Sequence, residues 1–273
     1  MITSLNNPKI KEVIKLNNKA RARKDAGVFL VEGIRMLREV PFDLLKEVYM
    51  TQDFFDKHGD EPVLERLKTY LDRPARLAGD DIFVTLVSDE CMQKICDTVT
   101  PQGVICVIKR RSYEITDMNA GDGTFILLLE NIQDPGNLGT MIRTAEAAGA
   151  TGVIMSQGTV DVYSPKVVRA TMGAIFRVPF FYVPDMCQQI DKIKQLGLSV
   201  YAACLDGADW YTEPDYTKRC AILIGNEGNG LSKEAIARAD GGIFIPMDGQ
   251  VESLNASISA AVLMYEVHRQ RNS

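Results

Sequence analysis

Short apolar runs of strand length alternate with helical patterns in the second half of the chain, and this alternation constrains the fold more than any other feature. Strands are expected at 125–129, 152–155, 178–182, 198–203, 220–224 and 242–245. Helices are expected at 140–148, 164–172, 186–195, 232–239 and 255–270. Such an alternation predicts an α/β fold with a mostly parallel sheet and helices on both of its faces.

The first 110 residues repeat this alternation on a smaller scale. Helical patterns occupy 8–24, 34–40, 61–71 and 88–98, and strands are expected at 27–31, at 46–50 and at 82–85 or 103–108. A polar stretch that ends in two glycines follows and is typical of a linker. The 273 residues are therefore expected to form a smaller α/β domain at 1–110, a linker at 111–121 and a larger α/β domain at 122–273.

Composition and segment lengths point to a soluble, cytoplasmic protein. No apolar run approaches the roughly 20 residues that a membrane-spanning helix needs, and MITSLNNPKIKEV lacks the apolar core of a secretory signal. The six cysteines include no CxxC pair, and His58 and His268 are the only histidines, which disfavours a zinc site. We therefore expect no membrane association, no metal, and free thiols in a reducing cytosol.

The charge is distributed unevenly along the chain. The whole sequence carries a net charge of −5, which argues against indiscriminate binding to nucleic acid. Residues 1–25, however, hold seven Lys and Arg residues against two acidic ones, a net charge of +5, whereas 121–273 hold 12 against 17. A basic N-terminal segment in an otherwise acidic chain is compatible with contacts to the phosphate backbone of a nucleic acid. A solvated helix face is the alternative.

Three polar loops follow three of the expected strands. QDPGNLG comes after 125–129, GNEGNG after 220–224, and PMDGQVESLN after 242–245. Ligands of parallel α/β sheets bind outside the carboxyl ends of the strands, so the shared placement of these loops predicts one site. Asn137 lies in the first loop, and Arg143 is expected in the first turn of the helix after it. The free N–H groups of a helix start favour an anion, so this stretch is compatible with a site for a phosphorylated ligand. A loop with a solvated charge is the alternative.

The residues of the second and third loops disfavour several classes of reaction. GNEGNG is neither a dinucleotide-binding GxGxxG nor a lysine-containing P-loop, which disfavours nucleoside-triphosphate chemistry. A tight turn between a strand and a helix is the alternative explanation of its glycines. In the third loop, helix capping would account for Ser253 or Asn255 but not for the cluster that they form with Glu252. No His–Ser pair and no paired aspartates stand ready for hydrolysis.

Together, the three loops resemble the three motifs of the SpoU (TrmH-type) RNA ribose 2′-O-methyltransferases. The matching stretches are ENIQDPGNLGTMIRTAEAAGA, ILIGNEGNGLS and IPMDGQVESLNASISAAVLMYE, in this order. SPKVVRATMGAIFRVPF, between the first two, is also similar to the family. The resemblance covers roughly 122–273 and is highly specific. Residues 3–40 resemble more loosely the substrate-binding domain that precedes many such catalytic domains.

This resemblance implies a SPOUT catalytic domain with a deep trefoil knot, which binds S-adenosyl-L-methionine and works as a homodimer. Carried over by position, the cofactor-binding residues would be Gly225, Ile245, Met247 and Leu254. The catalytic group would comprise Asn137, Arg143, Glu227, Ser253 and Asn255. The family proposal makes Arg143 the base that takes the 2′-OH proton. An arginine is almost always protonated, so stabilising the developing alkoxide or positioning a phosphate are the alternatives.

The expected substrate is RNA. Ribosomal RNA is favoured because a separate N-terminal domain suits recognition of a structured RNA, and transfer RNA remains open. RNA-binding roles are expected for Lys19, Arg21, Arg23, Lys24, Lys166 and Arg169. The N-terminal domain carries no RNP-like aromatic pattern, zinc knuckle or glycine-rich KH loop that would specify a sequence.

Three other functions remain as alternatives. A non-catalytic RNA-binding protein on the same scaffold would be free to lose Arg143, Glu227, Ser253 and Asn255. A methyltransferase of the same fold that targets a base would differ in where the methyl group appears on digested nucleosides. An oxidoreductase that uses a dinucleotide is disfavoured, because no glycine fingerprint follows the first strand.

Overall fold

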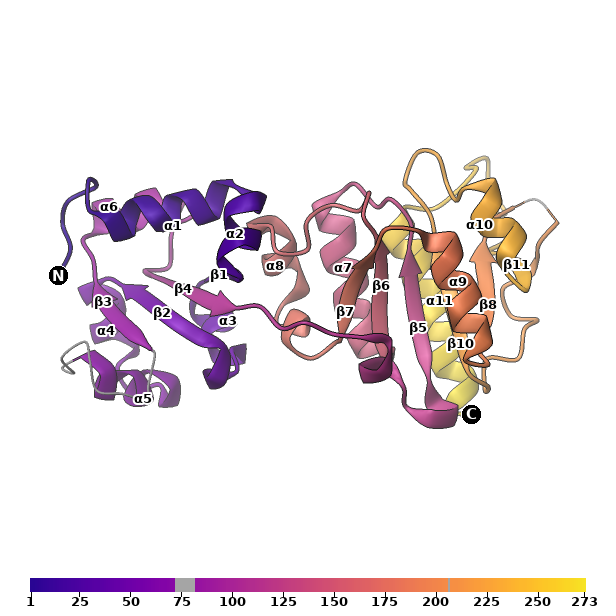
Figure 1. Ribbon diagram of the computed structural model, residues 1–273, viewed down its shortest axis with the longest axis horizontal. Coiled ribbons are helices and arrows are strands. Elements are labelled where there is room, and N and C mark those ends of the chain that lie inside the picture. Colours follow the sequence, from indigo (N-terminus) through magenta and orange to yellow (C-terminus); the bar gives the residue numbers. More distant parts are fainter. Residues whose placement is uncertain (72–81, 206) are drawn as a thin grey trace. The chain divides into compact units, whose positions relative to one another are not determined.

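The computed structural model describes residues 1–71, 82–205 and 207–273, which form two compact units (Figure 1). The first unit comprises 1–111 together with 163–176, and the second comprises 112–162 and 177–273. The segment 163–176 lies within the domain expected at 122–273 but packs with the N-terminal residues. No helix in the described ranges is long and apolar enough to cross a membrane.

The sheet of the first unit has four strands in the order β1-β4-β2-β3. Their bounds are Val28–Glu32 for β1, Leu45–Met50 for β2, Phe83–Leu86 for β3 and Val104–Lys109 for β4. β4 runs antiparallel to β1 and to β2, whereas β2 and β3 are parallel. Both 82–85 and 103–108, given as alternatives by the sequence, therefore supply strands.

Seven α-helices surround this sheet in the described part of the unit. They are α1 (Pro8–Asn18), α2 (Ala20–Ala26), α3 (Ile34–Glu39), α4 (Gln52–His58), α5 (Pro62–Leu71), α6 (Asp89–Ile95) and α8 (Pro165–Thr171). Ile10, Val13 and Leu16 of α1 are buried in one apolar cluster with side chains of β1, β4 and α6. The single helix predicted at 8–24 is wrong, because the extended backbone of Lys19 divides it into α1 and α2.

Side chains of 163–176 explain why this segment belongs to the first unit. The ring of Phe29 in β1 lies 4.9 Å from that of Tyr163 and 6.0 Å from that of Phe176, centroid to centroid. The guanidinium of Arg110 lies 4.0 Å from the Tyr163 ring centroid. Aromatic and cation–π contacts of this kind add to the free energy of apolar burial. The segment 163–176 therefore packs against β1, the edge strand of this sheet, which α8 also contacts.

The sheet of the second unit has seven strands, all parallel, in the order β7-β6-β5-β10-β8-β11-β9. They are β5 (Phe125–Leu129), β6 (Gly152–Ser156), β7 (Phe180–Val183), β8 (Ser199–Ala203), β9 (Asp209–Trp210), β10 (Cys220–Ile224) and β11 (Gly241–Phe244). Every residue of β5 and β10 is buried. Strands covered on both faces read as continuous apolar runs, which is why the sequence predicts these two so well. The predicted mostly parallel sheet is confirmed.

Among the described residues of this unit, four α-helices pack on the sheet. Their bounds are Pro135–Ala147 for α7, Met186–Gln195 for α9, Lys233–Arg238 for α10 and Ala256–Arg271 for α11. α9 and α10 contact each other, and α7 and α11 form another contacting pair. Figure 1 shows α9 and α11 on opposite faces of the sheet. The expected layers, with helices on both faces of the sheet, are therefore confirmed.

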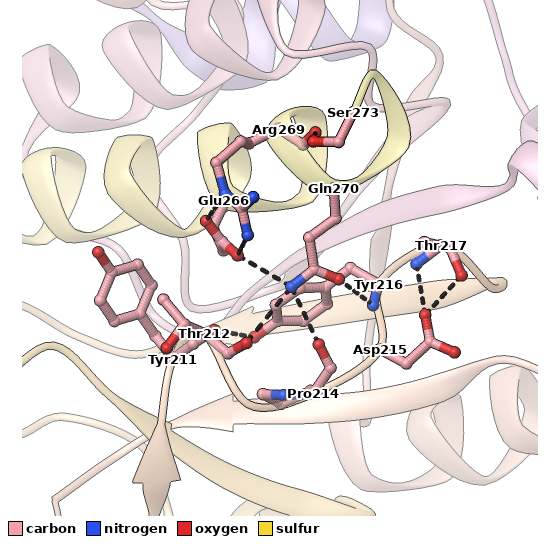
Figure 2. A network of polar contacts seen from close by, with 10 residues as sticks. All are labelled: Tyr211, Thr212, Pro214, Asp215, Tyr216, Thr217, Glu266, Arg269, Gln270 and Ser273. Carbon is pink, nitrogen blue, oxygen red and sulfur yellow. Dashed lines mark hydrogen bonds and ion pairs between the residues drawn. The ribbon is translucent and has the colours of Figure 1, made fainter.

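The last turns of α11 are tied to the loop between β9 and β10 (Figure 2). The side-chain amide of Gln270 donates to the carbonyl oxygens of Thr212 (3.4 Å) and Pro214 (3.1 Å) and accepts from the Tyr216 N–H (2.9 Å). It also donates to Glu266, which pairs with Arg269. A single side chain thus satisfies several backbone groups that would otherwise lose their hydrogen bonds, and it fixes α11 against the sheet.

Candidate active site

The carboxylate of Glu227 joins the loop after β10 to the loop after β5. Its Oε2 accepts a hydrogen bond from the Gln133 N–H (3.0 Å). Its Oε1 accepts from the Asp134 N–H (3.0 Å) and from Nδ2 of Asn137 (3.0 Å). Burial alone would raise the pKa of Glu227, but these hydrogen bonds outweigh it and hold the pKa below its usual value. The carboxylate is therefore an ionised bridge between two loops.

Asn255 joins the third loop to the same network. Its Nδ2 donates to Oδ1 of Asn137 (3.0 Å). Its own Oδ1 caps α11 by accepting from the N–H groups of Ser257 (2.8 Å) and Ile258 (3.3 Å). Capping and loop bridging are therefore performed by one side chain, because the two ends of its amide have different partners. The meeting of the three loops, predicted from their shared place at strand ends, is observed in the structure.

The loop Gly225–Gly230 is a tight turn held by Asn226. Asn226 and Gly230 exchange two backbone hydrogen bonds, and Oδ1 of Asn226 accepts from the N–H groups of Gly228 and Asn229. Nδ2 of Asn226 donates to the carbonyl oxygen of Asn131 (2.8 Å). A Cβ atom at position 225 would lie 2.3 Å from the carbonyl carbon of Gly230. The turn itself thus requires glycine at 225, whatever else this residue binds.

The start of α7 differs from the prediction. The helix begins at Pro135, so Arg143 lies in its third turn rather than in its first. Asp134 caps the helix by accepting from the Asn137 N–H (2.8 Å). The helix predicted at 140–148 is present as the later part of α7, but its predicted start was wrong, because proline is favoured at the first helical position. The anion site expected from that start and Arg143 is therefore wrong as well. A carboxylate of the chain itself occupies the helix start.

Arg143 and Ser253 stand outside the hydrogen-bond network. Both side chains are exposed. Arg143 makes no hydrogen bond or ion pair with any residue that the structure describes. Its guanidinium therefore keeps all of its donors for a ligand, which is the arrangement that recognition of a phosphate or an oxyanion requires.

A cavity of about 140 Å³ lies at the carboxyl ends of β8 and β11. Ile245, Met247 and Leu254, three of the residues expected to hold the cofactor, line it together with Ser253. The apolar walls suit an adenine ring, and the lining Glu252 carboxylate suits a cationic sulfonium, so S-adenosylmethionine fits the chemistry of the cavity. Gly225 is not among the lining residues.

The sequence missed one wall of this cavity, the segment Ala203–Leu205 at the end of β8. The segment carries no polar cluster, so it did not stand out as the other three loops did. Its place after a parallel strand was the available signal, because the same rule selected the other loops. Phe244 and Leu263, from β11 and α11, complete the apolar lining.

The residues expected to bind RNA lie in the first unit, and they differ in accessibility. Lys19, Arg21 and Lys24 are exposed. Arg23 is only 3% exposed, and its guanidinium donates to the carbonyl oxygens of Leu16 (2.8 Å) and Asn17 (3.0 Å). Arg23 therefore caps the end of α1 and presents no surface to RNA, which corrects that expectation.

The remaining two candidate RNA contacts lie on α8. Lys166 is exposed. Arg169 is half-buried and forms an ion pair of 2.7 Å with Asp97. Any contact of Arg169 with RNA must therefore compete with this ion pair.

Comparison with known proteins gives matches over both parts of the chain. The sequence profile of the SpoU rRNA Methylase family matches residues 124–265. A second profile, the MRM3-like substrate binding domain, matches residues 7–106. The two profiles therefore agree with the order of a substrate-binding domain before a catalytic domain.

Individual relatives match over nearly the whole chain. The 23S rRNA (guanosine(2553)-2′-O)-methyltransferase RlmP of Bacillus subtilis is 30% identical over 97% of this chain and 98% of its own length. The AdoMet-bound rRNA methyltransferase from Sinorhizobium meliloti is 28% identical, with a TM-score of 0.84 over 98% of this chain and 97% of that one. The SpoU methyltransferase AviRb from Streptomyces viridochromogenes, in complex with AdoMet, is 25% identical, with a TM-score of 0.84 over 98% and 99%.

Proposed function

The chain belongs to the SpoU rRNA methylase family, and we propose on that premise that it methylates a ribose 2′-oxygen of ribosomal RNA with S-adenosylmethionine. The observation that carries the proposal is the joining of the three motif loops through Glu227, Asn137 and Asn255. These loops lie beside a cavity whose chemistry suits the cofactor. Structural relatives along the whole chain were solved with AdoMet bound.

The reaction requires the chain to orient a hydroxyl group. The cofactor, held by Ile245, Met247 and Leu254, would supply a methyl group on a sulfonium, and the sulfur would leave with the electron pair of the carbon–sulfur bond, as a neutral thioether, when the 2′-oxygen takes the methyl carbon. The hydroxyl proton passes to solvent. Holding the oxygen in line with the methyl group accounts for much of the rate, since positioning alone is worth several orders of magnitude.

We assign Glu227 a positioning role rather than that of the base. A general base needs a free lone pair and a pKa near the working pH. Glu227 has a lowered pKa, and its two oxygens already accept three hydrogen bonds. Arg143, which has no partner among the described residues, is the group left to contact the RNA. Its permanent charge would stabilise the developing alkoxide or hold the adjacent phosphate.

The cofactor site is proposed at the cavity beside β8 and β11. Ile245, Leu254 and Met247 would contact the cofactor there, and Gly225 would contribute by shaping the adjoining turn. A cavity of about 140 Å³ is smaller than the roughly 300 Å³ at which ligand pockets begin. The loop 246–255, exposed along most of its length, would move outward to admit the cofactor.

We also propose that the protein acts as a homodimer through α11. Ile258 and Tyr265, two turns apart on this helix, are 50% and 49% exposed. Residues seven apart lie on one side of a helix, and large exposed apolar side chains in a row are typical of interfaces. We also propose the trefoil knot that the resemblance implies, and a cytoplasmic location.

The experiment that tests the substrate compares two acceptors. Labelled S-adenosylmethionine is incubated with purified ribosomal RNA, or with transfer RNA, from cells that lack this protein. We expect label in ribosomal RNA and not in transfer RNA. Label in transfer RNA alone would mean that transfer RNA, and not ribosomal RNA, is the methyl acceptor. Binding to RNA without methyl transfer to either RNA would favour the non-catalytic alternative. Methyl groups found on bases would favour the base-methylating alternative.

A further inference from the structure

A second cavity lies in the first unit, where β2 ends and β4 begins. Its volume is about 610 Å³, within the range of roughly 300–1,000 Å³ that small-molecule sites occupy. α4 and α6 supply most of its walls, and the start of α3 closes one side. Gly103 keeps the backbone close at the base of the cavity, because a Cβ there would lie 2.8 Å from Thr51 and from Phe54. The described residues of the proposed methyl-transfer site are all in the other unit.

Two glutamines present opposite hydrogen-bonding groups to this cavity. Oε1 of Gln102 accepts from the Ile34 N–H (3.2 Å), which leaves the NH₂ group of Gln102 available as a donor. Nε2 of Gln93 donates to the Val99 carbonyl oxygen (2.9 Å), which leaves the Gln93 carbonyl oxygen available as an acceptor. A ligand with adjacent donors and acceptors along one edge would satisfy both.

The charges of the lining disfavour an anionic ligand inside the cavity. Asp53 and Asp89 line it and are exposed, and neither forms a side-chain hydrogen bond or ion pair with a described residue. Lys57 is the one lysine or arginine among the lining residues. Two carboxylates against one ammonium favour neutral groups that donate hydrogen bonds, such as exocyclic amino groups, over phosphate.

The remaining walls suit a flat ring. Phe54 is 3% exposed and Met92 2% exposed, so these two side chains back the cavity rather than face a ligand. His58 and Ile34 are half-buried and supply the ring and the apolar surface that a ligand can reach, and the His58 ring centroid lies 4.7 Å from that of Phe54. Nucleobases bind proteins by stacking on aromatic and apolar side chains while their edges form hydrogen bonds.

Basic side chains next to the lining complete the pattern. Arg35 follows Ile34 on α3, and Lys94 follows Gln93 on α6. Both are exposed and make no hydrogen bond or ion pair through their side chains with a described residue. With Lys57 on α4, they place positive charge on three helices around a cavity that is itself acidic. Phosphates on either side of a bound nucleotide would meet these cations while its base enters the cavity.

We propose that this cavity binds an unpaired nucleobase of the RNA substrate, one that carries an exocyclic amino group. The proposal rests on the proposed function, from which it takes RNA as the ligand. Adenine, cytosine and guanine each have such a group, and uracil has none. The first unit would thus select the RNA by a base outside the methylated nucleotide.

The test measures binding of the full-length protein to short oligo(A), oligo(C) and oligo(U) RNA of equal length. We expect the wild type to bind oligo(A) or oligo(C) at least about threefold more tightly than oligo(U). The double variant Asp53→Ala/Asp89→Ala should remove this preference. The ratio of affinities is the readout, because removing two negative charges raises binding to every RNA.

A matched control removes two carboxylates elsewhere in the unit. Asp60 and Glu65 are exposed and do not line the cavity, so Asp60→Ala/Glu65→Ala should keep the preference for amino-bearing bases. Thermal unfolding checks that both double variants fold. Equal binding of all three oligonucleotides by the wild type, or a preference that survives Asp53→Ala/Asp89→Ala, would overturn the proposal.

Ultraviolet crosslinking locates the contact independently of the variants. Crosslinks between ribosomal RNA and peptides that contain Phe54, His58 or Met92 are expected, and crosslinks confined to α1 and α2 would contradict the cavity. Methyl transfer by the same preparations separates this inference from the proposed function. If the wild type transfers methyl groups but shows no base preference, only the proposed base-binding role of the cavity is wrong. If it shows a base preference but transfers no methyl group, the proposed methyltransferase activity is wrong.

Discussion

At the scale of single residues, the candidate site is organised by side chains that bridge loops. Glu227 and Asn255 meet at Asn137, each through one hydrogen bond of 3.0 Å. Motif spacing predicted that these residues gather, because all three follow parallel strands. It could not predict that Glu227 is committed to backbone N–H groups of another loop, since such partners depend on the folded loop.

The lowered pKa of Glu227 determines how its contributions to stability and to methyl transfer depend on pH. A carboxylate whose pKa is lower in the folded protein stabilises the fold above its unfolded pKa, near 4.5, and this contribution is lost as pH falls through the folded pKa. Methyl transfer should therefore show no step from Glu227 between about pH 6 and 9. The Glu227→Gln variant should transfer more slowly at every pH without changing the shape of the pH–rate profile. A step that disappears in the variant would make Glu227 the base.

Gly225 offers a steric test of the second loop. A methyl group there would meet the Gly230 backbone, whereas a Cβ at Gly123, outside the three loops, has nothing within 4 Å. Gly225→Ala should destabilise the protein by about 2 kcal/mol or more and weaken cofactor binding, because the turn must open. Gly123→Ala serves as the control and should leave both unchanged. Urea unfolding and calorimetric titration of S-adenosylmethionine measure the two effects, and equal behaviour of the variants would contradict this view of the turn.

At the scale of elements, buried strands were predicted better than helix ends. β5 and β10 begin and end where the sequence placed them, since strands buried on both faces are apolar throughout. The start of α7 was missed because Pro135 and Gly136 were interpreted as a loop, although proline at the first helical position and Asp134 before it signal a helix start. β9, with two exposed residues, carries no pattern that could be recognised.

The attachment of α11 provides a prediction at this scale. Gln270→Ala would leave the carbonyl oxygens of Thr212 and Pro214 and the Tyr216 N–H without their side-chain partner. We expect a loss of about 1–3 kcal/mol in the free energy of unfolding. Gln188→Ala, at an exposed position of α9, should change it by less than about 0.5 kcal/mol. Chemical denaturation of both variants is the measurement, and equal midpoints would show that the network in Figure 2 contributes little.

At the scale of the whole molecule, the sequence indicated two α/β parts but not the membership of 163–176. The pattern of α8 is local and says only that a helix forms. Its partners, such as Phe29, lie more than 100 residues earlier in the chain, and a single sequence carries no signal for contacts at that distance. The three motif loops were predictable as a group because one rule, placement after parallel strands, applies to all of them.

The proposed dimer also belongs to this scale. Replacing Ile258 and Tyr265 by aspartate puts two charges on the exposed apolar side of α11 and should yield a monomer by light scattering at micromolar concentration. Leu196→Asp, at the residue that caps the end of α9 and is 47% exposed, should leave the dimer intact. A wild type that is monomeric, or a double variant that remains dimeric, would rule out this interface.

The measurement that tests the central claim most directly is methyl transfer under single-turnover conditions to ribosomal RNA from cells lacking the protein, with the product nucleosides identified by mass. The wild type should yield a 2′-O-methylated nucleoside. Arg143→Ala should slow transfer by about 100-fold, whereas Lys192→Ala, which removes a charge from α9 outside the site, should match the wild type. A methyl group on a base, or an Arg143→Ala variant as fast as the wild type, would contradict the account.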